Sequence, residues 1–417
     1  MPALHAADWA VLALYAAVVV GLGILARHRQ RDTDEFFLGG RDLPWLLVGA
    51  SILATAFSAT SLLGGPGEAF GHGLLWLQLQ LGDLLAILVV AVLFIPFFRG
   101  LALRTAYEYL ERRFGPAART AGSVLFQLQV LFRTGILVYG PSLALATLTD
   151  IDVGWAIVVV GVIATVYTVL GGITAVVWTD VLQLAVVLGG LVLTAIAIAG
   201  AVPGGFGGAL QMAAGGERLR LVDPSLPVTS VRSIAGAVIG YGLLSLSVAG
   251  TNQQPVQRYL SCRSVGAAQR AALLGWFVGL VVTATTLVVG VMLYAFYQVH
   301  AGALPEGTAA DAVFPHFIAT ELPVGVAGLL VAAIFAAAMS SLDSALNSLA
   351  TASVVDVYQR FVRRDAPDRH YLRVARWLTV GWGVLGIAVG LYVAGRGGLL
   401  EMAVRYMNYF AGPLLGL

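Results

Sequence analysis

The stretch Ala332–Ser348 places polar side chains in the middle of a segment that is otherwise apolar enough to lie in a bilayer. Helical spacing puts on one face Ala337, Ser340, Ser341 and Ser344. Asp343 lies beside that face, and a carboxylate in hydrocarbon is costly unless it meets a cavity, a partner or a cation. Hydroxyl and carboxylate oxygens are the ligands that hard cations prefer. The cluster therefore predicts an alkali-cation site inside the membrane, although the serines alone are also typical of hydroxyls that bond their own backbone where helices pack closely.

The composition is that of a membrane protein. Hydrophobic residues make up 59% of the 417 residues, charged residues 11%, and the mean hydropathy is +0.87. These values are far from those of an average soluble domain. The single cysteine, Cys262, excludes a disulfide framework within this sequence. We expect an all-α, multi-pass protein of the cell inner membrane or plasma membrane, with the lipid bilayer as its surroundings.

About eleven apolar stretches are long enough to span a bilayer. They lie at about residues 9–26, 45–70, 74–98, 121–147, 154–170, 178–201, 231–252, 271–298, 323–349, 374–395 and 402–417. The last of them reaches Leu417 shortly after Pro413. We therefore expect a chain that is truncated at its C-terminal end, with further helices beyond it.

The basic residues predict the orientation in the membrane, and all 24 of them are arginine. If the N-terminus lies outside, the inside loops carry Arg27, Arg29, Arg31, Arg41, Arg99, Arg104, Arg112, Arg113, Arg119, Arg258, Arg263, Arg270, Arg360, Arg363, Arg364, Arg369, Arg373 and Arg376. The outside loops and span ends hold only Arg218, Arg220, Arg232, Arg396 and Arg405. This excess of arginine on one side predicts that the N-terminus is outside. The segment Met1–Asp8 also lacks the basic region of a cleavable signal.

Two of the stretches are interrupted by helix-breaking residues. The stretch 49–70 contains Gly64, Gly65, Pro66 and Gly67, and the stretch 231–252 is followed by Pro255 after Gly250 and Asn252. Interrupted spans at corresponding places in two halves indicate an inverted-repeat transporter whose site lies at the breaks. Each half would hold five helices, after one extra helix. Kinks without any ligand are the alternative, because glycine and proline are common in membrane helices.

The chain resembles the sodium/solute symporter family from about Asp34 to Arg376. The stretches that carry the resemblance are EFFLGGRDLPWLLVGAS, IPFFRGLALRTAYEYLERRFG, YTVLGGITAVVWTDVLQ, QQPVQRYLSCRS and TELPVGVAGLLVAAIFAAAMSSLDSALNSLATASVVDVYQRF. The segments GPGEAFGHGLLWL and RTGILVYGPSLAL are similar to the iodide, monocarboxylate and vitamin carriers, and Ala332–Asp356 is similar to the bacterial sialic acid symporters.

The family implies a LeuT-like core of five plus five helices. Its parts in this chain would be an N-terminal helix and cytoplasmic loop (1–44), a first repeat half (45–201), an extracellular loop (202–230) and a second repeat half (231–417).

The resemblance also implies two sodium sites. The principal site would consist of the carbonyls of Ala54, Phe57 and Ala337 and the hydroxyls of Ser340 and Ser341. A second site, which only some members use, would consist of Asp180, Ser340, Asp343 and Ser344. The sialic acid carriers have serine where this chain has Asp343, so the extra carboxylate would either tighten sodium binding or carry a proton. Asp180 has an alternative role as the start of a helix after Gly171–Gly172, because aspartate is a frequent cap.

Arg133 gives the main indication of the substrate. It lies in the middle of the stretch 121–147, where a lipid-facing arginine would be costly, and its planar guanidinium suits a carboxylate. The sialic acid carriers have an arginine at the matching place, so the resemblance implies a substrate site of Ser58, Ser61, Gln80 and Arg133. This chain departs from them with Ala56 in place of a threonine. The alternative is a structural ion pair between Arg133 and Asp83, one helix away.

The sequence thus predicts a sodium-coupled secondary active symporter that takes up a small organic anion, such as a sialate, a monocarboxylate or a vitamin acid, by alternating access. A neutral sugar or amino acid, or an inorganic anion such as iodide, is the alternative substrate. No zinc, P-loop, nucleophile-elbow or dinucleotide motif occurs in its proper context. We therefore expect a transporter and not an enzyme, with sodium as coupling ion, no cofactor, no nucleic-acid partner and a monomeric state.

Overall fold

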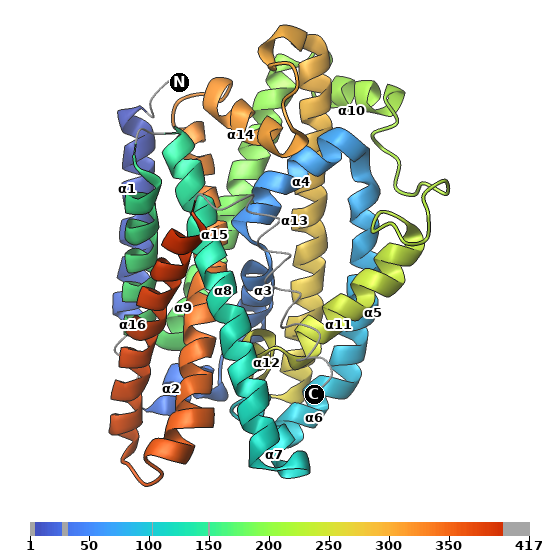
Figure 1. The fold of residues 1–417 in the computed structure, drawn as a ribbon. Helices are drawn as coiled ribbons and strands as arrows, with labels where there is room; N and C mark the ends of the chain where they lie inside the picture. The colour runs from blue at the N-terminus through green and yellow to red at the C-terminus, as the bar shows by residue number, and fades with distance from the viewer. Residues whose placement is uncertain (1–4, 27–31, 102, 149–150, 395–417) are drawn as a thin grey trace.

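The computed structural model describes residues 5–26, 32–101, 103–148 and 151–394, and this part of the chain is almost entirely helical (Figure 1). By length and composition, seven helices or continuous helical stretches in it could cross a membrane. They are Ala6–Leu25, Ala59–Gly100, Pro116–Ala146, Val153–Ala201, Val265–Val299, Val326–Val362 and Asp368–Val393. Two shorter apolar helices cover Trp45–Ala56 and Gly236–Thr251.

The elements of the first part of the chain are α1 (Ala6–Ala26), α2 (Thr33–Leu38), α3 (Trp45–Ala56), α4 (Ala59–His72), α5 (Leu79–Val89), η4 (Val90–Phe94), α6 (Ile95–Gly100), α7 (Glu108–Phe114), α8 (Pro116–Leu148) and α9 (Val153–Ala201). The second part holds α10 (Gly205–Gly215), η5 (Gly236–Tyr241), α11 (Gly242–Thr251), α12 (Gln253–Ser261), α13 (Val265–Val299), α14 (Ala310–Thr320), α15 (Val326–Ala352), η7 (Ser353–Val362) and α16 (Asp368–Val393).

The expected all-α membrane fold is confirmed, and helices occupy ten of the eleven expected stretches. The stretch 402–417 lies outside the described residues. Two expected spans are joined in α9, which has 49 residues and bends at Gly172 with φ 52° and ψ −157°. Only glycine adopts this backbone conformation readily, so the chain changes direction there without a loop. The inverted repeat and the exact number of spans stay predictions.

The first interrupted span breaks at Phe57–Ser58, between α3 and α4, and not at the Gly64–Gly67 cluster where the break was expected. Phe57 and Ser58 are extended, while Pro66 lies inside α4. The small residues of the cluster instead allow close packing on α13. A Cβ on Gly290 of α13 would lie 2.1 Å from the Pro66 carbonyl oxygen, and one on Gly65 would lie 2.6 Å from the Thr286 methyl carbon.

The second interrupted span breaks where the sequence predicted it. Asn252 ends α11 and caps α12 with an extended backbone, and its side-chain oxygen accepts a hydrogen bond from the Gln254 amide. Pro255 sits in the first turn of α12, where a missing N–H costs no helical hydrogen bond. The side chain of Asn252 therefore satisfies an amide that the break leaves free.

The helix α15 lies at the centre of the bundle, and nearly all of its residues from Leu330 to Ala352 are buried. It packs against α8 and α9, and also against α1, α3, α4 and α16. In Figure 1, α10 and α14 lie at one end of the molecule and α2 and α7 at the other, with both breaks between these ends. The polar residues of α15 are thus enclosed, about midway along the bundle.

Candidate functional site

The predicted principal sodium site joins the end of α3 to the middle of α15. The Ser340 hydroxyl donates to the Ala54 carbonyl at 2.7 Å and to the Ala337 carbonyl at 3.1 Å. The Ser341 hydroxyl donates to the Thr55 carbonyl at 2.9 Å. Both serines are buried, so these oxygens are shielded from water. Hydrogen bonds therefore join three of the five expected ligands, namely Ala54, Ala337 and Ser340. Ser341 bonds the neighbouring carbonyl of Thr55 instead, and Phe57 follows at the break of the span.

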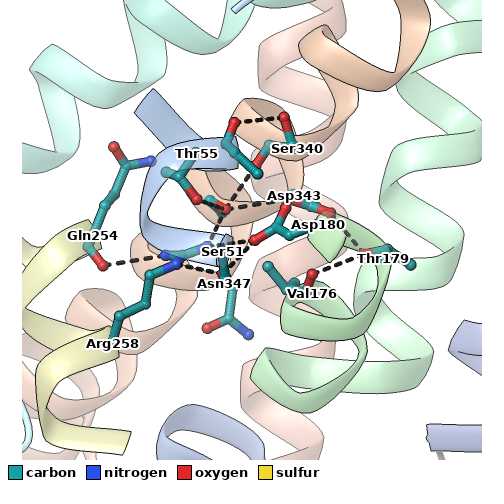
Figure 2. A network of polar contacts seen from close by, with 12 residues as sticks. Ser51, Thr55, Val176, Thr179, Asp180, Gln254, Arg258, Ser340, Asp343 and Asn347 are labelled. Carbon is teal, nitrogen blue, oxygen red and sulfur yellow. Dashed lines mark hydrogen bonds and ion pairs between the residues drawn. The ribbon is translucent and has the colours of Figure 1, made fainter. Parts of the chain in front are cut away.

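A buried ion pair lies beside this site (Figure 2). The Arg258 guanidinium of α12 is 3.0 Å from Oδ2 of Asp180 on α9 and also donates to the Ser344 hydroxyl at 2.5 Å. The Ser51 hydroxyl donates to the same Asp180 oxygen at 2.5 Å. Asp180 is completely buried and lies well inside its helix, eight residues after Gly172. The alternative role of Asp180 as a helix cap is therefore not observed.

Asp343 forms a second acidic position next to that pair. Its Oδ2 accepts from the Tyr167 hydroxyl at 2.9 Å and from the Thr179 hydroxyl at 3.4 Å, and its Oδ1 is 3.2 Å from the Ser344 hydroxyl. Arg258 pairs directly with Asp180 alone, whereas the side chains that contact Asp343 among the described residues do so through hydroxyl groups. Oδ1 of Asp180 is buried and has no hydrogen-bond partner among the described residues. Buried oxygens of this kind are normally satisfied, and the two carboxylates exceed the nearby cationic charge by one.

Sequence reasoning missed part of this network and misplaced one of its members. Arg258 was counted among the arginines of the inside loops, yet its side chain is only 1% exposed and lies within the bundle. The signal that could have found it was its position six residues after Asn252, in the short segment that follows a helix break. The other missed residues are Ser51, Thr55, Tyr167 and Thr179. They lie on α3 and α9, and only the fold brings them to α15.

The four residues expected to bind substrate are spread around the two breaks. Ser58 is the first residue before α4, and Ser61, one turn later, is exposed. Gln80 on α5 donates to the Thr283 hydroxyl at 3.4 Å, and its Oε1 is buried without a partner among the described residues. Arg133 on α8 reaches Oε1 of Gln254 on α12 at 3.4 Å. The polar groups therefore come from α4, α5 and α8, while the break after α11 lies next to Arg133.

The alternative ion pair between Arg133 and Asp83 is not observed. Asp83 accepts a hydrogen bond from the Ser245 hydroxyl on α11, and no ion pair joins it to an arginine within the described residues. Among the described residues, the long contact to Gln254 is the only polar contact of the Arg133 guanidinium. Two half-buried opposite charges inside the bundle thus have no ionic partner in the described part of the chain, which is unusual for charges in such a place.

A bundle of apolar helices with two broken spans and an enclosed polar centre has the fold of a secondary membrane transporter, and solved structures bear this out. The structure of a sodium-coupled sialic acid symporter in a substrate-bound outward-open state matches with a TM-score of 0.90 and 30% identity, covering 99% of this chain and 85% of that one. A transporter of the nucleobase-cation-symport-1 family matches with a TM-score of 0.59 and 18% identity, over 91% of this chain and 79% of that one.

The sequence comparisons agree. The model of the sodium:solute symporter family matches residues 36–417, and this chain belongs to that family. Over the whole length of this chain, its sequence is 34% identical to the human sodium/iodide cotransporter, and the match covers 65% of that protein. It is 31% identical to the sodium/sialic acid symporter NanT of Aliivibrio fischeri, over 98% of this chain and 81% of the relative.

Proposed function

We propose that this protein couples inward movement of sodium to the uptake of a small organic anion, and that Arg133 binds the carboxylate of the substrate. The observation that carries the proposal is that Arg133, near the middle of α8, has no ionic partner among the described residues. An arginine presents its donors in a planar fork that matches a carboxylate. Its position next to the break at Asn252 puts it where transporters of this architecture bind their cargo.

We propose that the principal coupling ion binds to the carbonyls of Ala54, Phe57 and Ala337 and the hydroxyls of Ser340 and Ser341. The set consists of neutral oxygens, which suits a monovalent ion that has to leave again on the other side of the membrane. The carbonyls of Ala54 and Ala337 already converge on Ser340, at 2.7 Å and 3.1 Å. On binding, the ion would contact the two carbonyl oxygens that now accept hydrogen bonds from the Ser340 hydroxyl.

We propose a second cation position between Asp180 and Asp343, with Ser340 and Ser344 beside it. The unsatisfied Oδ1 of Asp180 and the excess of one negative charge in this buried cluster support it. Each elementary charge that moves inward gains about 2.3 kcal/mol per 100 mV of membrane potential. Two sodium ions with one monoanion would therefore carry one net positive charge inward, and the membrane potential would drive accumulation of the substrate.

The test is sodium-dependent binding of carboxylates by the purified protein, followed by uptake into proteoliposomes. With sodium present, and not with potassium, a panel of small acids should contain at least one that stabilises the protein against thermal unfolding. Arg133→Gln should abolish this effect, and Arg133→Lys should weaken it, because an ammonium cannot form the paired hydrogen bonds. The exposed Arg270 gives a matched control, since Arg270→Gln should behave as wild type. Acid binding that persists in Arg133→Gln would reject the assignment.

A further inference from the structure

The carboxylate of Asp83 on α5 is half-buried and lies next to the second interrupted span. It lies on the face of α5 opposite the exposed Leu81, Leu85 and Leu88, so it points into the bundle. Its one hydrogen-bond donor in the described part of the chain is the Ser245 hydroxyl. A carboxylate at this depth with one neutral partner keeps most of its hydrogen-bonding capacity unused.

A second unused acceptor lies beside this carboxylate. One turn earlier on α5, the Gln80 Oε1 is buried and lacks a donor among the described residues. This face of α5 therefore offers oxygen acceptors, which suit a ligand that brings hydrogen-bond donors.

The two charged residues flank one broken span. Ser245, which holds Asp83, lies on α11, and Gln254, which meets Arg133, lies on α12 just past Asn252. Asn252, with its extended backbone, lies between these two contacts. A small molecule lying along this break would therefore have a guanidinium on one side and a carboxylate on the other.

From this juxtaposition we infer that the substrate carries hydrogen-bond donors, an ammonium or a group of hydroxyls, at the end away from its carboxylate, and that Asp83 selects for them. The inference rests on the proposed function, in which Arg133 binds the carboxylate. It separates the candidate substrates, since a plain monocarboxylate or an inorganic anion such as iodide leaves Asp83 and Gln80 unsatisfied. A polar site rejects ligands that leave its buried groups unpaired.

The experiment measures sodium-dependent binding of three acids of similar length, namely hexanoate, 6-aminohexanoate and gluconate, to the purified protein. Wild type should bind 6-aminohexanoate or gluconate at least about tenfold more tightly than hexanoate. Asp83→Asn should remove most of that preference and leave hexanoate unchanged. Equal binding of all three acids by wild type, or an undiminished preference in Asp83→Asn, would overturn the inference.

Two further variants separate recognition from a structural role. Ser245→Ala keeps the carboxylate and removes only its present partner, so the preference for donors should persist; its loss would show that Asp83 merely holds α11. Thr285→Ala, an exposed position whose hydroxyl bonds its own helix, controls for disturbing the bundle and should match wild type. If no acid binds in a sodium-dependent manner, or if Arg133→Gln leaves acid binding intact, the proposed function is rejected. This inference, which rests on the proposed function, is then rejected as well.

Discussion

Individual hydroxyl groups of α15 are connected to α3, and this connection explains how ion binding can reach the broken span. Ser340 and Ser341 donate to successive carbonyls, those of Ala54 and Thr55, at the last turn of α3. A cation placed among these oxygens would bind the hydroxyl and carbonyl oxygens directly, in place of the hydrogen bonds between them. It would thereby fix the distance between α3 and α15. Since two of the residues expected to bind substrate, Ser58 and Ser61, follow immediately, sodium and substrate would order the same short segment.

Ser341→Ala should raise the sodium concentration needed for half-maximal uptake, because it removes one of about five ligands. Losing one oxygen ligand should cost on the order of 1 kcal/mol, or roughly five- to tenfold in sodium affinity. The measurement is substrate uptake into proteoliposomes against external sodium concentration. Ser348→Ala, a buried serine of the same helix that bonds only the Ala345 carbonyl, is the control. Unchanged sodium dependence in Ser341→Ala would remove Ser341 from the site.

Asp343→Ala should change the number of coupled ions. Asp343 and Asp180 together exceed the charge of Arg258 by one, so we expect two sodium ions per substrate in wild type and a Hill coefficient that approaches two. Without the Asp343 carboxylate, the coefficient should fall toward one, and the charge moved per monoanion should fall with it. A Hill coefficient of one in wild type, with electroneutral uptake, would contradict a second sodium site. If Asp343→Ala still couples two sodium ions, the second site exists but Asp343 is not one of its ligands.

At the scale of helices, the sequence predicts where the helices lie along the chain better than it predicts which residues of different helices make contact. Hydropathy located the helices, and Asn252 with its flanking Gly250 and Pro255 located the second break, because these residues act on their own backbone. The first break lies at Phe57–Ser58, where no glycine or proline marks it, since packing of α3 and α4 on α13 and α15 decides it. The Arg258–Asp180 pair joins residues 78 positions apart. No local pattern reports such a contact.

The short helix α7 should lose its attachment in acid. Glu111 of α7 accepts hydrogen bonds from Arg360 of η7 and from Arg119 of α8, the latter at 2.8 Å. These arginines, Arg360 first, lower the pKa of Glu111 from 4.5 to about 2. A lowered carboxyl pKa adds stability that is complete above about pH 4.5 and is lost as the pH falls toward 2.

Thermal unfolding of the purified protein from pH 5 to pH 2.5 measures this contribution. Glu111→Gln should be less stable than wild type at pH 5, and the difference should shrink as the pH falls. Glu217→Gln, at an exposed carboxylate paired only with Arg220, is the control and should show no such difference. A difference in unfolding temperature between wild type and Glu111→Gln that stays constant from pH 5 to pH 2.5 would mean that the ion pairs do not stabilise α7.

On the scale of the whole molecule, one buried network at the α7 end connects α12 with α8 and η7. Asp356 of η7 is completely buried and accepts from Arg119 of α8 at 2.7 Å and from the Thr105 hydroxyl at 2.7 Å. The segment that carries Thr105 also holds α12, because Gln253 accepts from the Ala106 amide at 2.8 Å and donates to the Arg104 carbonyl at 3.1 Å. The Thr105–Asp356 bond therefore ties the broken span to α8 and η7.

The single cysteine should report the opening of this end. Cys262 is buried at the end of α12, where its carbonyl accepts a hydrogen bond from Arg99 of α6, so movement of α12 away from α6 should expose it to a thiol reagent. Thr105→Ala removes a hydrogen bond to a carboxylate worth about 1.5–3 kcal/mol, which should raise the rate of maleimide labelling of Cys262 by roughly tenfold or more. Sodium should slow the labelling in both proteins if it favours the state closed at this end. Thr120→Ala, whose hydroxyl bonds only the Pro116 carbonyl, should label as wild type. A labelling rate in Thr105→Ala equal to that of wild type would show that this bond does not hold α12 closed.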